Sequence, residues 1–434
     1  MGCCGVPKSA DPETYLRLAC ERVLPSEGRR NNGPQSGGET AVISRACIAA
    51  GTLDQARAHQ VLDEYALAMA LRDQHRGRML MHRRRARAPV EGQRLSAHRV
   101  AVCEFHFERS DQHWILERVL FADDATHLDL SGTDPAGQMF NQRRRGGLVG
   151  PGPRAMPHKP QPQTLTVRDD QGTTVTGHQG TGSWGGGSWQ SSYRTDVPLS
   201  PETRWIEVDG TRIELPERGP APEVHLEEIE RRDPLRAMLY GEIMSTDRRH
   251  GGDDTVEIAC RALVDIGALG EDDPLLLEIR QIAGAVAGAA PVPGLAEPWA
   301  SLVARFSKTD GPQGRLAIGA VIDDLDGYSI RLDALTSDAG SFSISLAVSP
   351  GTPLLRFPGV DLDPSPIVWW AEDDRHNAYV AFFDNGGGSE NLAEGQVTSL
   401  AALDPRATEL RLLPTASRTR AVINVPLAGL ASPT

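Results

Sequence analysis

Two pairs of adjacent aspartates are candidates for acid–base or cation-binding chemistry. Asp169-Asp170 and Asp373-Asp374 each lie between two runs in which apolar residues alternate. Carboxylates held close together drive their pKa values apart, which suits a general acid and base, and carboxylate oxygens also bind hard cations. Neighbouring side chains in a strand point to opposite faces, however, and Asp, Asn and Gly are typical of hairpin turns. The pairs are therefore predicted to be turn carboxylates, with a cation site or a catalytic pair as the alternatives.

A glycine-rich loop carries the second candidate site. Its segment 180–185 (G-T-G-S-W-G) matches the G-x-G-x-x-G fingerprint, but a strand-like run follows where that fingerprint needs a helix. The loop therefore predicts no dinucleotide cofactor. Trp184 and Trp189 lie among its glycines and are the predicted binding residues, because exposed indoles often anchor interfaces and stack on sugars. The alternative is that both rings pack against the fold.

Cys103, His106 and His113 are close enough in sequence to suggest a metal site. Strand alternation places Cys103 and His106 on opposite faces, so joint ligation would need a bulge. None of the six cysteines stands in a C-x-x-C pair, which argues against a structural zinc site and against a disulfide framework. We therefore predict no metal, no cofactor and no catalytic residue.

The elements that would position these residues begin with helices. Apolar residues recur at helical spacing in three segments of 11–80, and the pattern returns across 258–282. Gly51 and Gly267 end apolar helical runs, as expected of C-terminal residues in the left-handed conformation. Each half of the chain is therefore predicted to begin with a small bundle of about three helices.

Each helical region is followed by residues that alternate with a period of two. The expected strands include 164–167, 173–178, 204–208 and 211–215 in the first half and 367–371, 378–383, 409–413 and 421–425 in the second. Turn signals interrupt them at intervals of roughly 8–12 residues, which is typical of an antiparallel sandwich of about seven strands.

The chain also resembles itself at an offset of roughly 210 residues. Trp114 corresponds to Tyr328, and the first aspartate pair corresponds to the second. The predicted fold class is therefore α+β, a tandem duplication of a helical bundle followed by an antiparallel immunoglobulin-like β-sandwich. The predicted domains are a helical bundle over 1–90, a sandwich over 97–217 with a flexible insert at 131–163, a second bundle over 222–306 and a second sandwich over 314–429.

The second half carries a resemblance to known proteins. Its segments I-V-W-W-A-E-D-D-R-H-N-A-Y-V at 367–380, G-G-G-S at 386–389 and R-A-V-I-N-V-P-L at 420–427 resemble uncharacterised proteins of GC-rich bacteria with immunoglobulin-like β-domains. The resemblance implies a β-domain. No activity is attached to that group, so the resemblance implies no site residues.

Composition narrows the class of partner. The 434 residues carry a net charge of −13, which argues against nucleic acid, because such binding depends on neutralising phosphates. We expect no membrane association, since no run of about 18 apolar residues is present. The start, M-G-C-C-G-V, has Val6 where a myristoylation motif needs Ser or Thr, and no secretory segment follows. The expected location is the cytoplasm, and the oligomeric state is left open.

These observations favour a non-catalytic intracellular protein that binds or scaffolds a partner, such as another protein. One alternative is a hydrolase or transferase whose site lies in a cleft between bundle and sandwich and uses the aspartate pairs. The other is a carbohydrate- or peptide-binding module that uses Trp184 and Trp189.

Overall fold

The protein is built mainly from antiparallel strands, since the computed structural model contains 48% strand and 22% helix. It describes residues 11–23, 35–72, 94–109, 112–133, 163–185, 188–217, 219, 221–229, 232–245, 253–288, 304–305, 308–351, 367–388, 391–399, 401–416 and 418–430. The predicted flexible insert at 131–163 therefore lies mostly outside the described residues.

The described elements comprise a set of helices and two sheets. The helices are α1 (Pro12–Val23), α2 (Gln35–Ala49), α3 (Gln55–Arg72), α6 (Arg232–Ser245), α7 (Asp253–Asp265) and α8 (Pro274–Gly288). The first sheet contains β1 (Arg99–Arg109), β2 (Gln112–Phe121), β3 (Thr126–Thr133), β4 (Thr164–Asp169), β5 (Thr174–Gly185), β6 (Ser188–Thr195), β7 (Trp205–Val208) and β8 (Thr211–Glu214). The second contains β9 (Val224–Glu228), β10 (Gly314–Leu325), β11 (Tyr328–Ser337), β12 (Phe342–Ser349), β13 (Val368–Asp373), β14 (Ala378–Gly388), β15 (Ala393–Ser399), β16 (Glu409–Thr415) and β17 (Thr419–Pro426).

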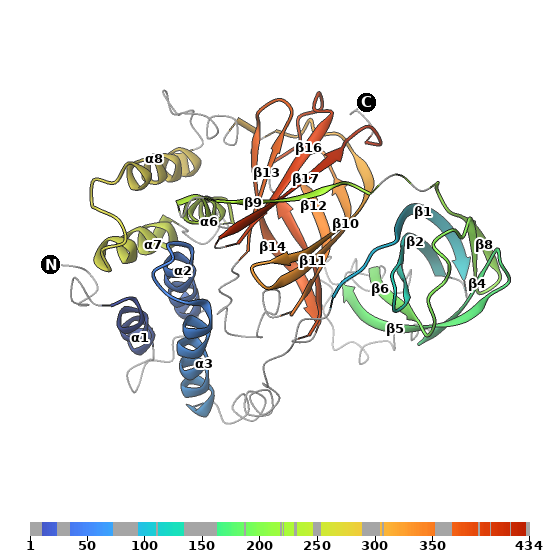
Figure 1. Ribbon diagram of the computed structural model, residues 1–434, viewed down its shortest axis with the longest axis horizontal. Helices are drawn as coiled ribbons and strands as arrows, with labels where there is room; N and C mark the ends of the chain where they lie inside the picture. Colours follow the sequence, from blue (N-terminus) through green and yellow to red (C-terminus); the bar gives the residue numbers. More distant parts are fainter. Residues whose placement is uncertain are drawn as a thin grey trace, which may run out of the picture.

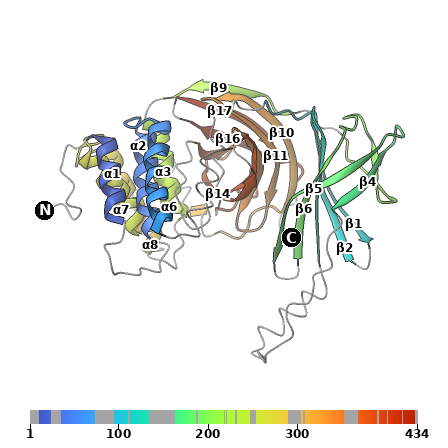
Figure 2. The ribbon, with the colours of Figure 1, turned by 90° about the horizontal axis from the view of Figure 1, so that it is seen from below.

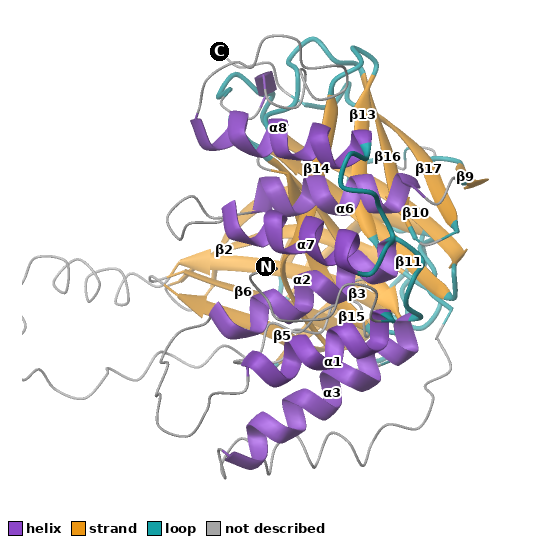
Figure 3. Ribbon diagram, turned by 90° about the vertical axis from the view of Figure 1, so that its left-hand side faces the viewer, coloured by secondary structure: helices purple, strands orange, loops and turns teal. Residues whose placement is uncertain are grey.

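These elements lie in three layers. The helices lie on one side, the second sheet occupies the middle, and the first sheet lies on the far side (Figures 1 and 2). Helix α6 contacts β13 and β14, while β1 contacts β10 and β11. Seen from the helical side, the helices stack across the face of the second sheet (Figure 3). The second sheet is therefore covered by helices on one side and by the first sheet on another.

The helices begin and end as local chemistry requires. Asp11 precedes α1, and its Oδ1 accepts a hydrogen bond at 3.0 Å from the N–H of Thr14, in the first turn. Asp54 and Asp273 serve α3 and α8 in the same way. Gly51 and Gly267 follow α2 and α7 with φ angles of 64° and 76°, which confirms their prediction as helix C-terminal residues.

The predicted separation into two helical bundles is wrong, and so is the repeated bundle-plus-sandwich unit. Val42 and Ala46 of α2 belong to the apolar core of α6, α7 and α8, while Ala262 of α7 belongs to the core of α1, α2 and α3. Three short helices leave part of their apolar surface uncovered, and here each set covers that of the other. The result is one helical layer.

The predicted immunoglobulin-like sandwiches are also wrong. Each set of strands forms one continuous sheet, and the first sheet is nearly closed on itself. Their strand orders are β1-β2-β3-β6-β5-β4-β7-β8 and β10-β11-β12-β15-β14-β13-β16-β17-β9. Alternation with a period of two marks which face of a strand is buried. It is the same in a sandwich and in a strongly curved sheet that encloses its own core.

Strand β9 joins the second sheet by pairing with β17, although it lies in a stretch predicted to belong to linker and helices. Within the same sheet, Trp369 of β13 points into the sheet's core, while its neighbour Trp370 packs against the helical layer. These opposite directions follow from strand alternation. They show that β13 has one face toward each of two apolar cores.

Candidate functional site

The candidate site lies where the two sheets meet. Strand β11 is buried along almost its whole length, so both of its faces are covered. One face carries Ile330 and Leu332 into the core of the second sheet. The other face carries Arg331 and Asp333, which are only 3% and 2% exposed because the first sheet covers them.

These charges belong to a buried ion-pair network that crosses between the sheets. Arg331 Nε donates to Asp333 Oδ1 at 2.7 Å within β11. From the first sheet, Arg118 Nη1 lies 2.6 Å from Asp333 Oδ2, and Arg118 Nε donates to Asp129 Oδ2 at 2.7 Å. Buried charges persist only when they are well paired, so this network fixes how the two sheets meet.

Burial and the charges of the network together shift the pKa values of Asp333, Glu394 and His127. Burial opposes ionisation of Asp333, but the guanidinium groups of Arg118 and Arg331 outweigh it and hold the pKa of Asp333 below its ordinary value. Burial raises the pKa of Glu394, and the guanidinium of Arg331 opposes that rise. Burial, aided by Arg331, lowers the pKa of His127 to about 4, so this imidazole is neutral at pH 7.

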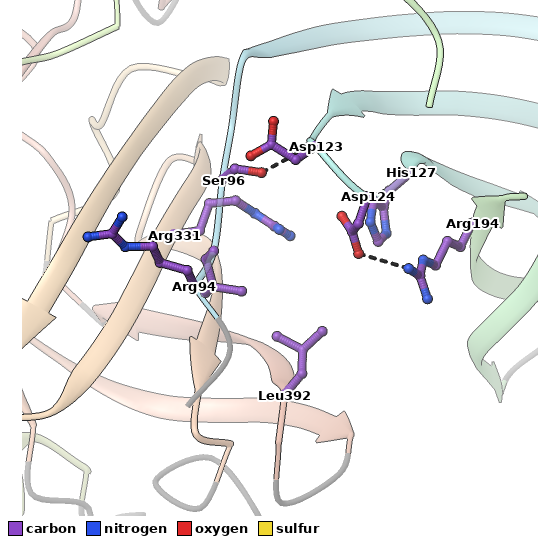
Figure 4. A pocket seen from close by; sticks show the side chains of 9 residues that line it. Arg94, Ser96, Asp123, Asp124, His127, Arg194, Arg331 and Leu392 are labelled. Carbon is purple, nitrogen blue, oxygen red and sulfur yellow. Dashed lines mark hydrogen bonds and ion pairs between the residues drawn. The ribbon is translucent and has the colours of Figure 1, made fainter. Parts of the chain in front are cut away.

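A cavity of about 130 Å³ adjoins the network (Figure 4). Its walls are formed by Arg94, Leu95, Ser96, Asp123, Asp124, His127, Arg194, Arg331 and Leu392. The first sheet and the segment before it supply all of these residues except Arg331 and Leu392, which belong to the second sheet and the turn before β15. The cavity therefore exists only because the two sheets pack together.

Both carboxylates at the cavity wall, Asp123 and Asp124, have a side-chain partner. Asp124 accepts a hydrogen bond from Arg194 at 2.8 Å, and Asp123 lies 2.5 Å from the His98 imidazole. Within the described part of the chain, by contrast, Arg331 Nη2 is buried without a hydrogen-bond acceptor, and Glu394 Oε1 lies 3.5 Å from it as an ion-pair partner only. The group at the cavity that can still form a hydrogen bond is thus the cationic donor Arg331 Nη2.

The cavity offers no arrangement for nucleophilic catalysis. Ser96 is the hydroxyl at its wall, and Ser96 Oγ accepts a hydrogen bond from the backbone N–H of Asp123 at 2.9 Å. Among the hydrogen bonds of the described residues, none joins Ser96 to His127. A serine nucleophile needs a base within hydrogen-bond reach, and the described residues give Ser96 no such partner in His127.

No protein-family model matches the chain, and no curated protein matches it. Among solved structures, the chain is similar to a conserved domain protein from Bacillus anthracis, at 9% sequence identity and a TM-score of 0.17, over 73% of this chain and 77% of that one. A likeness this weak carries no argument about fold or function.

Asp169 and Asp373 are the last residues of β4 and β13, just before the turns that follow these strands. Asp169 Oδ1 accepts hydrogen bonds from the backbone N–H groups two and four residues later, at 3.0 and 2.7 Å. Asp373 Oδ1 does the same, with both distances 2.9 Å. Asp170 and Asp374 point away from these turns and accept from the backbone N–H groups of the segments before β7 and β16. These are the hydrogen bonds of turn carboxylates.

The two predicted tryptophans lie opposite each other on β5 and β6, where Trp184 pairs with Trp189. Trp189 is only 5% exposed, and its ring meets that of Trp114 edge-on, with the centroids 4.5 Å apart. The exposure that a surface binding role requires is therefore not found for Trp189. The side chain of Trp184 lies outside the described residues.

Gly132 explains how Trp189 fits into the sheet. A Cβ atom at Gly132 would lie 2.5 Å from Trp189 Cζ2 and equally close to the carbonyl oxygen of His113. Only a residue without a side chain lets the indole lie against β3 at this point.

Sequence analysis did not identify Arg94, Arg194, Arg331 and His127. A signal for one of them exists, because Arg331 and Asp333 are two residues apart on one face of an apolar strand. Within the described residues, no group of three or more metal-ligating side chains is found. Nor does any described helix have the length and apolar character needed to span a membrane.

Proposed function

We propose that this chain is a non-catalytic binding protein whose cavity between the sheets holds a small anionic group, a carboxylate or a phosphate. The observation that carries this proposal is the donor of Arg331 at the cavity wall, buried and lacking an acceptor among the residues that the structure describes. A buried N–H group without an acceptor costs about 1–3 kcal/mol, and more when it is charged. An oxygen of a bound anion would remove that cost through a charge-assisted hydrogen bond.

Three further groups favour an anion. Arg94 is exposed at the mouth of the cavity and forms no hydrogen bond or ion pair with the described residues. The Ser96 hydroxyl accepts one hydrogen bond and retains its own proton to donate. His127 is neutral and can also donate one N–H. The cavity wall therefore offers hydrogen-bond donors to an anion from Arg94, Ser96 and His127.

The size of the cavity limits the ligand. At about 30 Å³ for each water molecule in the liquid, 130 Å³ has room for about four waters. This volume suits acetate or phosphate, or the charged end of a larger molecule.

Titration calorimetry with sodium acetate and with sodium phosphate tests this proposal. We expect one of the two anions to bind with one-to-one stoichiometry. Arg94→Ala should weaken it at least tenfold, because it removes an unpaired cation without disturbing the buried network. Arg375→Ala is the matched control, since Arg375 is an equally exposed arginine in the turn after β13. Absence of binding at 10 mM (roughly the weakest affinity of interest), or equal weakening by both variants, would contradict the proposal.

An intracellular location is part of the proposal and is supported by the cysteines. Cys20, Cys47, Cys103 and Cys260 are free thiols, and burial raises their pKa values to about 12, 12, 12 and 11. Unpaired, unreactive thiols suit a reducing compartment. No observation of similar weight to the buried Arg331 donor supports the hydrolase alternative or the carbohydrate-binding alternative.

A further inference from the structure

The hairpin of β1 and β2 brings two histidines together on its outer surface. His106 Nδ1 lies 2.9 Å from His113 Nε2, and the ring centroids are 5.1 Å apart. In the strand register, His113 pairs with Glu108 and His106 with Ile115, so the two histidines are diagonal neighbours. Their side chains are 47% and 38% exposed. The pair is therefore held by regular strand pairing and is open to solvent.

A carboxylate faces the outer nitrogen of each ring. His113 Nδ1 lies 3.0 Å from Glu108 Oε1, and His106 Nε2 lies 3.6 Å from Glu104 Oε1. An ionised carboxylate only accepts hydrogen bonds, so Nδ1 of His113, which lies within hydrogen-bond distance of Glu108, is the nitrogen that carries hydrogen. In a neutral imidazole the other nitrogen, Nε2 of His113, is then an acceptor. Glu104 lies beyond hydrogen-bond distance of His106.

The inner nitrogen of His113 is therefore an acceptor that faces His106 Nδ1 across 2.9 Å. A proton on His106 Nδ1 or a metal ion bound by both rings can lie between the two nitrogens. A histidine whose outer N–H faces a carboxylate is also the usual arrangement at a metal, because the carboxylate orients the ring and raises its basicity.

We propose that His106 and His113 bind a divalent transition-metal ion of the copper or nickel class, with Glu104 and Glu108 as positioning residues. Metal–nitrogen bonds are about 2.0–2.1 Å long, so two imidazoles at a right angle place their nitrogens about 2.9 Å apart. A tetrahedral angle would need about 3.3 Å, which is wider than the observed spacing. Square or octahedral geometry is preferred by Cu²⁺ and Ni²⁺.

The remaining coordination positions are filled by water. In the described residues no third metal-ligating side chain joins the pair, so the site is open and exchangeable rather than structural. The opposite face of β1 carries Phe107 into the core of the first sheet, independently of the histidines. Substitution of either histidine therefore leaves that core intact.

Metal titration of the full chain tests this inference with Ni²⁺ by calorimetry and with Cu²⁺ by electron paramagnetic resonance. We expect one ion per chain at the hairpin and nitrogen couplings from two imidazoles. His106→Asn and His113→Asn should each weaken binding at least tenfold. Glu108→Gln should weaken it about tenfold as well, since it removes only the orienting carboxylate.

His225→Asn is the matched control. His225 is an exposed strand histidine with a carboxylate, Glu223, 3.5 Å away, but it lacks a second imidazole. Its substitution should leave metal affinity unchanged. The inference is overturned if wild-type protein shows no imidazole coupling with one equivalent of Cu²⁺. It is equally overturned if the single variants at His106 and His113 bind Ni²⁺ as tightly as wild type, in which case the inner nitrogens share a proton.

Discussion

The two sheets share the order of eight strands, to which β9 is added in the second sheet, but they differ in what covers them. In the first sheet, Trp114 is fully buried, and its indole N–H finds no acceptor among the described residues. Tyr328 was predicted to be its counterpart in the second sheet. The hydroxyl of Tyr328 accepts a hydrogen bond from Gln55 Nε2 of α3 at 2.5 Å. Among the described elements, the helical layer packs against β13 and β14 of the second sheet through α6. The difference shows that topology fixes where side chains lie, while the neighbouring layer decides which polar groups are satisfied.

The turn aspartates show the same contrast. Asp373 Oδ2 accepts hydrogen bonds from Asn377 Nδ2 at 2.8 Å and from the hydroxyl of Tyr379 at 2.7 Å. Within the described ranges, Asp169 Oδ2 is buried without a partner. The two turns therefore have the same backbone hydrogen bonds, but in the described structure only Asp373 has hydrogen-bond partners for its Oδ2 atom.

Removing the carboxylate shared by both sheets should have the largest effect. Asp333→Ala leaves the guanidinium groups of Arg118 and Arg331 buried and underpaired, which should cost about 3–5 kcal/mol of unfolding free energy. Urea denaturation measures this cost. Asp323→Ala, at an exposed position of β10, should stay within about 0.5 kcal/mol. A loss below about 1 kcal/mol for Asp333→Ala would show that the network does not hold the sheets together.

Acid should weaken the boundary between the sheets through His127. Its folded pKa of about 4 lies below the ordinary histidine value of 6.5, so the unfolded chain binds more protons between these values. Stability should therefore fall as the pH drops from 6.5 to 4, by about 3 kcal/mol at most from this group. Urea midpoints across this range measure the fall. His127→Gln should flatten the pH dependence, and an unchanged slope would contradict the assignment.

Gly132→Ala tests how the first sheet accommodates its aromatic core. The new methyl group would collide with the Trp189 ring and with backbone, so we expect a loss of about 1–3 kcal/mol and a change in tryptophan fluorescence. Gly177→Ala is the control on the same sheet, because its Cβ would have ordinary contacts at 3.7 Å. Equal effects of the two substitutions would rule out the close approach.

The smallest expected effect is the one that compares the turns directly. Asp373→Asn replaces an oxygen that accepts two hydrogen bonds, and should cost about 1–2 kcal/mol. Asp169→Asn changes an oxygen without a partner in the described structure and should cost about 0.5 kcal/mol or less. Thermal unfolding of both variants measures the two losses of stability. A larger loss for Asp169→Asn than for Asp373→Asn would contradict the proposed difference between the turns.

Local structure was predictable from sequence because its causes are local. The strand expected at 378–383 lies within β14, and those at 164–167 and 421–425 lie within β4 and β17. The near-closure of the first sheet was not predictable, since alternation is identical in sandwiches and curved sheets. The shared helical layer was missed for a similar reason, because an apolar stripe does not specify its partner.

The candidate site was missed for a tertiary reason. In an alternating strand, Arg331 and Asp333 occupy the positions that normally face solvent. They are buried because the first sheet lies over β11, a contact between residues more than two hundred positions apart. Trp189 was misplaced for the converse reason, since glycine neighbours suggested an exposed loop whereas Gly132 makes room for its ring inside the sheet.

The central claim is that the guanidinium of Arg331 receives an anion in the cavity between the sheets. Nitrogen-15 NMR of the arginine side chains during titration with acetate or phosphate tests it directly. The account predicts that the Nη resonances of Arg331, assigned by the Arg331→Lys variant, shift saturably with the bound fraction. Resonances that stay unchanged while the anion binds, or the absence of any saturable shift in the protein, would contradict it.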